Sequence, residues 1–184
     1  MIAKQYADPH ILAKVRAAYP YDLNHLLPSG IIQQSLDWFK TFMKWDKSPN
    51  LLRSNSVLNI LETRRGRCGE WANLYTAVLN SLGVESRLVL DFTDHVWTEV
   101  LVNSIPTNLG QRWMHIDSTL SIVDSPLFYE REWKKKLTFV VAFSPTHITD
   151  VTYRYTTHMG LVRRRGKKFE PLFQALCGAY NHTW

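Results

Sequence analysis

The character of the chain changes at Gly83, and this change constrains the possible folds more than any other feature. Before Gly83, apolar residues recur at spacings of three and four residues, which is typical of amphipathic helices. After it, the segments 86–92, 95–102 and 112–118 are rich in β-branched and aromatic residues, which is typical of strands. Helices followed by a block of strands predict an α+β fold with N-terminal helices packed on an antiparallel sheet.

Single residues mark where several of these elements should begin or end. Ser29 is expected to cap the second helix and Gly83 to end the third, while Pro20 stops the first. The expected helices cover residues 10–18, 29–45, 68–82, 126–132 and 170–180, with further strands at 137–144 and 150–156 and a long turn at 103–111.

Composition limits where the protein works. Apolar residues make up 45% of the 184 residues, which is enough for a globular core. No apolar run approaches the length of a membrane span, and the first residues lack the features of a secretory signal. Two cysteines are also fewer than a small secreted domain usually carries. We therefore expect a cytoplasmic protein, with the nucleus as a second location, and no insertion into a membrane.

The chain is basic, with a net charge of +6 and clusters at 64–67, 134–136 and 163–168. Such clusters can attract nucleic acid or an acidic partner. No zinc-finger spacing or RNA-binding motif accompanies them. A solvated basic surface is therefore the favoured interpretation, and a nucleic-acid partner is not expected.

Cys68 is the candidate nucleophile. It opens the helix expected at 68–82, between Arg67 and Gly69. The unpaired N–H groups and the positive dipole end of a helix N-terminus favour a thiolate, and so does a neighbouring arginine. A buried and inert cysteine is the alternative, but the position at a helix start favours a reactive thiol.

A nucleophilic cysteine needs a base, and the base needs an orienting group. His95 opens one expected strand and Asp117 ends the next, so neighbouring strands would bring the two side chains together. His115 competes for the role of the base, but it would share the strand of Asp117 instead of facing it from the next strand. Position alone does not separate His95 from an ordinary surface or core histidine.

The segments that carry these residues resemble a known family. RRGRCGEWANLYTAVLNSLGVESRLVLDFTDHVWTEV and RWMHID closely resemble the cytoplasmic peptide:N-glycanases, which are members of the transglutaminase-like superfamily. The similarity covers about residues 30–157. It implies a transglutaminase-like, papain-like cysteine hydrolase core in a single domain of residues 1–184, with terminal helical extensions at 1–29 and 158–184.

The resemblance implies a role for each matching residue. Cys68 would be the nucleophile, His95 the base, and Asp117 the residue that orients the base. Supporting or substrate-binding roles would belong to a further set, although each member could instead serve packing or an ion pair. This set consists of Arg87, Trp97, Glu99 and Trp113. The resemblance also implies that an upstream indole, of Trp38 or Trp45, helps the Cys68 N–H to bind an oxyanion.

The implied reaction is that of a peptide-N4-(N-acetyl-beta-glucosaminyl)asparagine amidase. It hydrolyses the amide between an asparagine side chain and the first N-acetylglucosamine of an N-glycan, and it leaves aspartate. The implied substrates are misfolded N-glycoproteins or glycopeptides in ER-associated degradation. A ubiquitin-like shuttle factor of the proteasome is a further expected partner, which the terminal helices 10–18 and 170–180 could bind.

The chain departs from the family in one segment. The family inserts a zinc-binding segment with two Cys-x-x-Cys pairs before the RCGEW helix, whereas residues 46–66 of this chain are few and contain no cysteine. We therefore expect a minimal form with no metal or other cofactor and a more open cleft. Two alternatives stay open: a transglutaminase-like amidase or protease of other specificity, and an inactive binding module of the proteasome pathway.

Overall fold

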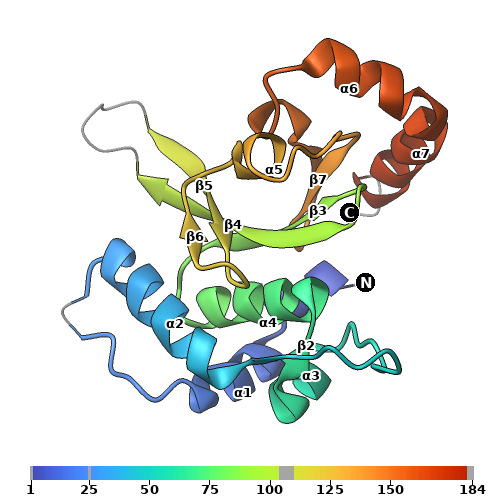
Figure 1. Ribbon diagram of the computed structural model, residues 1–184. Helices are drawn as coiled ribbons and strands as arrows, with labels where there is room; N and C mark the ends of the chain where they lie inside the picture. Colours follow the sequence, from blue (N-terminus) through green and yellow to red (C-terminus); the bar gives the residue numbers. More distant parts are fainter. Residues whose placement is uncertain (1, 25, 104–109, 182–184) are drawn as a thin grey trace.

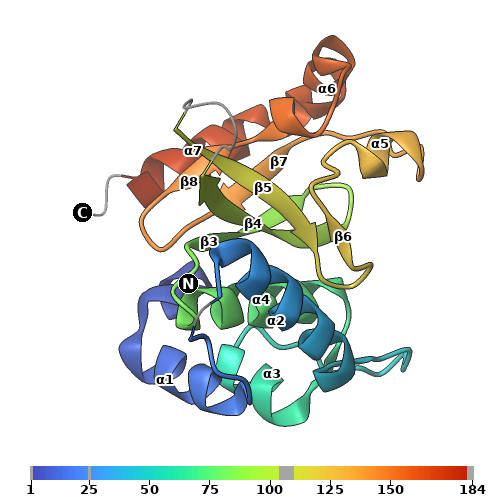
Figure 2. The same cartoon turned by 90° about the vertical axis from the view of Figure 1, so that its left-hand side faces the viewer.

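An antiparallel sheet separates the helices of the protein into two groups, as Figures 1 and 2 show. The computed structural model describes residues 2–24, 26–103 and 110–181. The strands of this sheet are β3 (Ser86–Asp91), β4 (His95–Asn103), β5 (Gln111–Asp117), β6 (Ile122–Val123), β7 (Val140–Phe143) and β8 (Ile148–Asp150). Within the described residues they follow the order β6-β5-β4-β3-β7-β8.

The helices on one side of the sheet come from the N-terminal half of the chain, and those on the other side come from the C-terminal half (Figure 1). The first group is α1 (Pro9–Ala18), α2 (Pro28–Phe42), α3 (Val57–Thr63) and α4 (Cys68–Ser81). The second group is α5 (Phe128–Arg131), α6 (Met159–Gly166) and α7 (Glu170–Asn181). Single-turn 3-10 helices lie at Ile2–Ala7, Thr152–Arg154 and Lys167–Phe169.

Helix α4 lies at the centre of the larger core. Every residue from Glu70 to Leu79 is buried, so the helix is surrounded by protein on all sides. It packs against β3 and β4 on one side and against α1, α2 and α3 on the other. Leu74, Tyr75 and Val78 are each fully buried as a result. This packing fixes the direction of α4 and therefore the position of its first residue, Cys68.

A second core covers the opposite face of the sheet. Successive side chains of a strand point to opposite faces, so the side chains of β4 enter both cores. On this second face, Trp97 of β4 stacks on Tyr129 of α5, with 4.6 Å between ring centroids, and contacts the tilted ring of Tyr155 at 4.7 Å. The α+β fold with the cysteine-bearing helix packed on an antiparallel sheet is therefore confirmed.

Two local expectations are wrong. Ser29 does not cap α2, because Leu27 is the cap and Pro28 occupies the first helical position, where its fixed φ suits a helix start. Residues 150–156 do not form one strand. The side chain of Asp150 accepts a hydrogen bond from the backbone N–H of Thr152 at 2.9 Å, which turns the chain into the 3-10 helix Thr152–Arg154.

The remaining sequence-based expectations, on element bounds, further helices and domain division, are partly correct and partly untested. Helix α2 ends at Phe42, and the next residues form the short strand β1 (Lys44–Trp45). Helix α3 was not expected, whereas α6 lies within the helical extension expected at 158–184. Most of the turn expected at 103–111 lies outside the described residues. The division into a core at 30–157 and two terminal extensions stays a prediction.

The burial of α4 predicts how strongly its side chains stabilise the fold. Leu74→Ala is expected to lower the free energy of unfolding by about 3 kcal/mol, because it removes fully buried methyl groups and leaves a cavity. Leu52→Ala is the matched control, since Leu52 is 91% exposed, and it should change the value by less than about 0.5 kcal/mol. Chemical denaturation measures both; equal losses would contradict the packing described for α4.

Candidate active site

Cys68 occupies the first turn of α4, where backbone N–H groups have no partner within the helix. The chain reaches this position through β2 (Arg65–Gly66), which pairs in parallel with β1. The pairing places Trp45 directly beside Gly66, two residues before Cys68. Two very short strands therefore bring an upstream tryptophan to the start of the helix that carries the candidate nucleophile.

The N-terminus of α4 is held by the buried carboxylate of Glu70. One carboxylate oxygen accepts the backbone N–H of Arg67 at 3.0 Å. The other accepts Arg53 Nε at 2.6 Å and the backbone N–H of Ser54 at 3.2 Å. Burial alone would raise the pKa of Glu70, but these hydrogen bonds outweigh it and lower the pKa. Gly66 allows the close approach, because a Cβ there would lie 2.2 Å from Glu70 Cβ.

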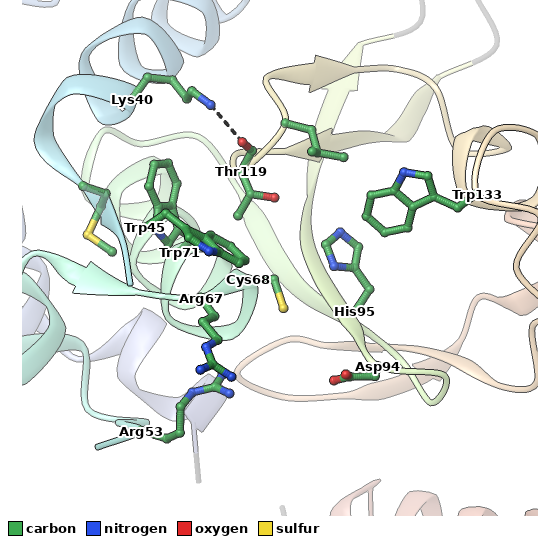
Figure 3. Close-up of a pocket in the computed structure, with 12 residues that line it drawn as sticks. Lys40, Trp45, Arg53, Arg67, Cys68, Trp71, Asp94, His95, Thr119 and Trp133 are labelled. Carbon is green, nitrogen blue, oxygen red and sulfur yellow. Dashed lines mark hydrogen bonds between the residues drawn. The ribbon is translucent and has the colours of Figure 1, made fainter. Parts of the chain in front are cut away.

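His95 and Asp117 are brought together by the register of the sheet. Glu99 of β4 pairs with His115 of β5, so Asp117 lies on the same face as His95. His95 Nε2 lies 2.7 Å from Asp117 Oδ2, and both side chains are buried. The other ring nitrogen of His95 is left for Cys68, which lies across the pocket from it in Figure 3.

Asp117 accepts hydrogen bonds on both oxygens. Oδ1 accepts the backbone N–H of Thr119 at 2.9 Å, its hydroxyl at 2.5 Å and the N–H of Leu120 at 3.3 Å. Oδ2 accepts from His95 and from the hydroxyl of Tyr129 at 2.8 Å. Burial would raise the pKa of Asp117, but these partners lower it to about 2. The carboxylate is therefore ionised at neutral pH.

The same contacts determine the protonation of His95. Burial alone would lower the pKa of its imidazole. The hydrogen bond and charge of Asp117, together with those of Cys68, outweigh burial and raise the pKa to about 9. An imidazolium is therefore the dominant form near neutral pH, and an imidazolium beside a cysteine favours the thiolate. The pair has the electrostatic arrangement of a cysteine hydrolase.

A pocket of about 720 Å³ contains this pair and is shown in Figure 3. Two of its tryptophans are exposed: Trp45 to 49% and Trp133 to 43%. The Trp133 ring lies 4.9 Å from the His95 ring, centroid to centroid. Lys40 of α2 lies near one end of the pocket and donates to the carbonyl of Thr119 at 2.8 Å. Arg53 lines the pocket from the segment that precedes α3.

The four supporting residues named from the sequence lie outside the lining of this pocket. Glu99 is fully buried and its two oxygens accept from Arg87, at 2.6 Å, and from Arg154, at 2.8 Å. The Arg87 guanidinium lies 3.8 Å from the centroid of the Trp113 ring. Trp97 Nε1 donates to Tyr155, which in turn donates to Glu99. Glu99 and its two arginines therefore form an ion-pair cluster, and Trp97 and Trp113 belong to the side chains around it.

The two candidate upstream indoles are separated by the structure. Trp45 lines the pocket that contains Cys68, whereas Trp38 does not. Trp38 packs against Tyr19 and Phe42, with ring centroids at 5.0 Å and 4.5 Å. His115, the rival base, is fully buried and lies 2.8 Å from the hydroxyl of Tyr129. It therefore does not take the position next to Cys68.

Sequence reasoning missed several residues that shape the site. Tyr129 binds Asp117, Trp133 packs on His95, and Arg53 and Lys40 line the pocket. Tyr129 and Trp133 lie in the segment SPLFYEREWKKK, within residues 30–157 that carry the family resemblance. No periodicity or spacing in that segment points to these roles.

Comparisons with known proteins agree with this geometry. The sequence profile described as "Transglutaminase-like superfamily" matches residues 15–118. The chain is similar to the peptide-N(4)-(N-acetyl-beta-glucosaminyl)asparagine amidase of Macaca fascicularis, with 46% identity over 130 residues, which are 70% of this chain and 19% of the relative. The amidase of Caenorhabditis briggsae is 33% identical over 202 residues, which cover 84% of this chain and 33% of the relative. The chain thus spans about a fifth to a third of these relatives.

The fold is also similar to a solved structure whose sequence identity to this chain is low. The crystal structure of Rad4-Rad23 bound to a 6-4 photoproduct UV lesion superposes with a TM-score of 0.68 and 16% identity, covering 100% of this chain and 52% of that chain. At that identity the match shows the fold alone. The sequence matches carry the assignment: this chain belongs to the peptide:N-glycanase family of the transglutaminase-like superfamily.

Proposed function

We propose that this chain is a cysteine-dependent amidase that cleaves the bond between asparagine and N-acetylglucosamine in N-glycosylated proteins or peptides. The observation that carries the proposal is that Cys68 and His95 line one open pocket, while the buried Asp117 holds His95 by a hydrogen bond. The relatives from Macaca fascicularis and Caenorhabditis briggsae are peptide-N(4)-(N-acetyl-beta-glucosaminyl)asparagine amidases, which supports the same substrate. Misfolded N-glycoproteins are the proposed substrates in the cell.

In the first step, the Cys68 thiolate attacks the carbonyl carbon of the asparagine side chain. The carbonyl oxygen becomes an oxyanion, which the backbone N–H of Cys68 can bind at the start of α4. The indole N–H of Trp45 is the proposed second donor, because Trp45 lines the same pocket. Both donors belong to elements whose positions the β1–β2 pairing fixes.

The intermediate then loses its nitrogen. The C–N bond breaks, the His95 imidazolium gives its proton to the departing nitrogen, and the sugar leaves as a glycosylamine. An acyl thioester remains on Cys68. The neutral His95 next takes a proton from water, the resulting hydroxide attacks the thioester, and the C–S bond breaks. The product acid leaves and loses its proton to solvent as aspartate, and the Cys68 thiolate and His95 imidazolium are regenerated. Asp117 keeps the imidazole oriented in both steps.

The exposed tryptophans favour a sugar at this pocket. Trp45 and Trp133 both line it and leave part of their rings accessible. Aromatic rings that are large, rigid and partly exposed are suited to bind the apolar face of a sugar while their N–H groups remain available. We propose that they hold the first N-acetylglucosamine residues next to His95.

A zinc ion does not fit the segment between β1 and α3. Residues 46–56 contain no cysteine or histidine. The only carboxylate there, that of Asp46, is engaged by Arg65 at 3.1 Å and by the backbone N–H of Ser48 at 2.8 Å. Among the described residues, no group of three His, Cys, Asp or Glu side chains could hold a metal. We propose catalysis without a metal.

Partners other than substrate stay predictions. The terminal helices α1 and α7 remain the proposed site for a ubiquitin-like shuttle factor, and a cytoplasmic or nuclear location remains an expectation. No helix within the described residues is long and apolar enough to cross a membrane.

The proposal predicts a specific product. Incubation with a denatured N-glycoprotein should release free glycan and convert the glycosylated asparagine to aspartate, as seen by mass spectrometry. Cys68→Ala should abolish both signals, because no acyl thioester can form. Absence of release, together with rapid alkylation of Cys68 by a haloacetamide, would instead indicate an amidase or protease of other specificity. A Cys68 that resists alkylation at neutral pH would indicate an inactive module.

The raised pKa of His95 predicts the effect of removing Asp117. In Asp117→Asn the negative charge is lost while burial remains, so the pKa of His95 should fall from about 9. Less of the imidazolium would remain at neutral pH, and alkylation of Cys68 should slow by at least about tenfold. Asp124→Asn is the control, because Asp124 binds Arg112 at 2.7 Å. An unchanged alkylation rate in Asp117→Asn would show that Asp117 does not maintain the ion pair.

Catalysis without a metal predicts insensitivity to chelators. Dialysis against EDTA and 1,10-phenanthroline should change neither glycan release nor the melting temperature, because the residues of segment 46–56 do not form a zinc site. Elemental analysis of the purified protein should find zinc well below one equivalent. A chelator-dependent loss of activity that added zinc restores would contradict the prediction.

A further inference from the structure

Behind the catalytic pair, a tyrosine joins Asp117 to a second histidine. The hydroxyl of Tyr129 lies 2.8 Å from Asp117 Oδ2 and 2.8 Å from His115 Nε2. Tyr129, His115 and Asp117 are all fully buried. The same Oδ2 also accepts from His95 at 2.7 Å. One carboxylate oxygen is therefore shared between the catalytic imidazole and a buried hydroxyl.

The donor and the acceptor in each hydrogen bond between Asp117, Tyr129 and His115 follow from the ionisation of Asp117. Asp117 is ionised, so it only accepts, and Tyr129 must donate its single proton to it. The Tyr129 oxygen then accepts from His115, which places the His115 proton on Nε2. His115 Nδ1 is accordingly left bare, and it is a buried atom without a hydrogen-bond partner among the described residues. Burial lowers the pKa of His115 to about 4, which keeps this ring neutral.

The shared oxygen has a consequence for His95. A carboxylate that accepts an additional hydrogen bond is a weaker base and attracts the neighbouring imidazolium less strongly. We propose that Tyr129, held in place by His115, is a positioning residue for Asp117 that limits how tightly His95 retains its proton. His95 must give up that proton to the departing nitrogen, so the tyrosine keeps the imidazolium acidic enough to act.

Other groups also face this hydrogen-bonded chain and must be considered in a test. His95 faces Cys68 of α4, and Asp117 Oδ1 is saturated by Thr119 and Leu120. The charged or titratable groups around His115 and Tyr129, besides Asp117 and His95, are Asp91, Glu99, Asp124 and Tyr155. None of these contacts is removed when Tyr129 loses only its hydroxyl oxygen.

Tyr155 provides a matched control. It is as buried as Tyr129 and contacts the same Trp97 ring. Its hydroxyl donates to Glu99 at 2.8 Å instead of to Asp117. Tyr129→Phe and Tyr155→Phe therefore remove the same atom from the same core, and only the first change frees Asp117 Oδ2.

The test measures the pKa of His95 directly, in a Cys68→Ala background that removes the influence of the thiol. Nitrogen-15 histidine NMR follows the titration, and the His95 signal is identified by its loss in His95→Asn. Tyr129→Phe should raise the pKa of His95 by about half to one unit, a three- to tenfold tighter hold on the proton. Tyr155→Phe should leave it unchanged. The measurement needs no substrate, so it is independent of whether the protein releases glycan.

A second variant keeps the proposal testable if Tyr129→Phe does not fold. His115→Asn removes the donor that supports Tyr129 but leaves the tyrosine in place, so it should raise the pKa of His95 by a smaller amount. Thermal melting confirms that each variant is folded. An unchanged or lowered pKa of His95 in folded Tyr129→Phe would overturn the proposal, and so would an equal rise in Tyr155→Phe. If Tyr129→Phe does not fold, the sign of the shift in His115→Asn decides.

Discussion

The hydrogen bond between His95 Nε2 and Asp117 Oδ2 is the interaction on which the site depends. A buried carboxylate is costly unless it is paired and fully hydrogen-bonded. Asp117 meets that requirement with donors from β4, from α5 and from the turn that follows β5. Because these elements converge on one carboxylate, the position of His95 is coupled to much of the fold.

The same sheet face carries a second buried acid. Glu99 lies on the same strand as His95 and on the same face, and it is paired with Arg87 and Arg154. The two carboxylates therefore do not compete for the same cation: arginines neutralise Glu99, and the imidazolium neutralises Asp117. An arginine remains charged at any ordinary pH, whereas an imidazolium can release its proton. Of the two acids, only Asp117 is therefore paired with a cation that can release its proton, the imidazolium of His95.

The turn before His95 is also held in place. The carboxylate of Asp91, at the end of β3, accepts from the backbone N–H of Thr93 at 2.8 Å and from Lys135 at 2.7 Å. Lys135 also donates to the carbonyl of Thr93 at 3.0 Å. His95 follows this turn directly as the first residue of β4. The lysine therefore restricts motion of the hairpin that carries the candidate base.

Much of this arrangement could be predicted because its signals are local. The Cys68 helix, the strands that carry His95 and Asp117, and the exclusion of His115 follow from periodicity, from a glycine stop at Gly83 and from strand alternation. Tyr129 could not be found that way, because its importance arises only when a four-residue helix folds back over the sheet face that carries Asp117 and His115. The strand predicted at 150–156 failed for a related reason, since the hydrogen bonds that Asp150 accepts from Thr152 outweighed β propensity.

The short segment 46–56 helps to fix the start of α4, the helix that carries Cys68. Arg53 and Ser54 bind one oxygen of Glu70, while the other oxygen accepts the N–H of Arg67, the residue before Cys68. Arg67 in turn donates to the carbonyl of Ser48 at 2.9 Å. Hydrogen bonds to a buried carboxylate thus connect segment 46–56 to the helix start without a metal ligand. Because Arg53 also lines the pocket, the residue that secures the start of α4 lies at the same pocket as the candidate nucleophile.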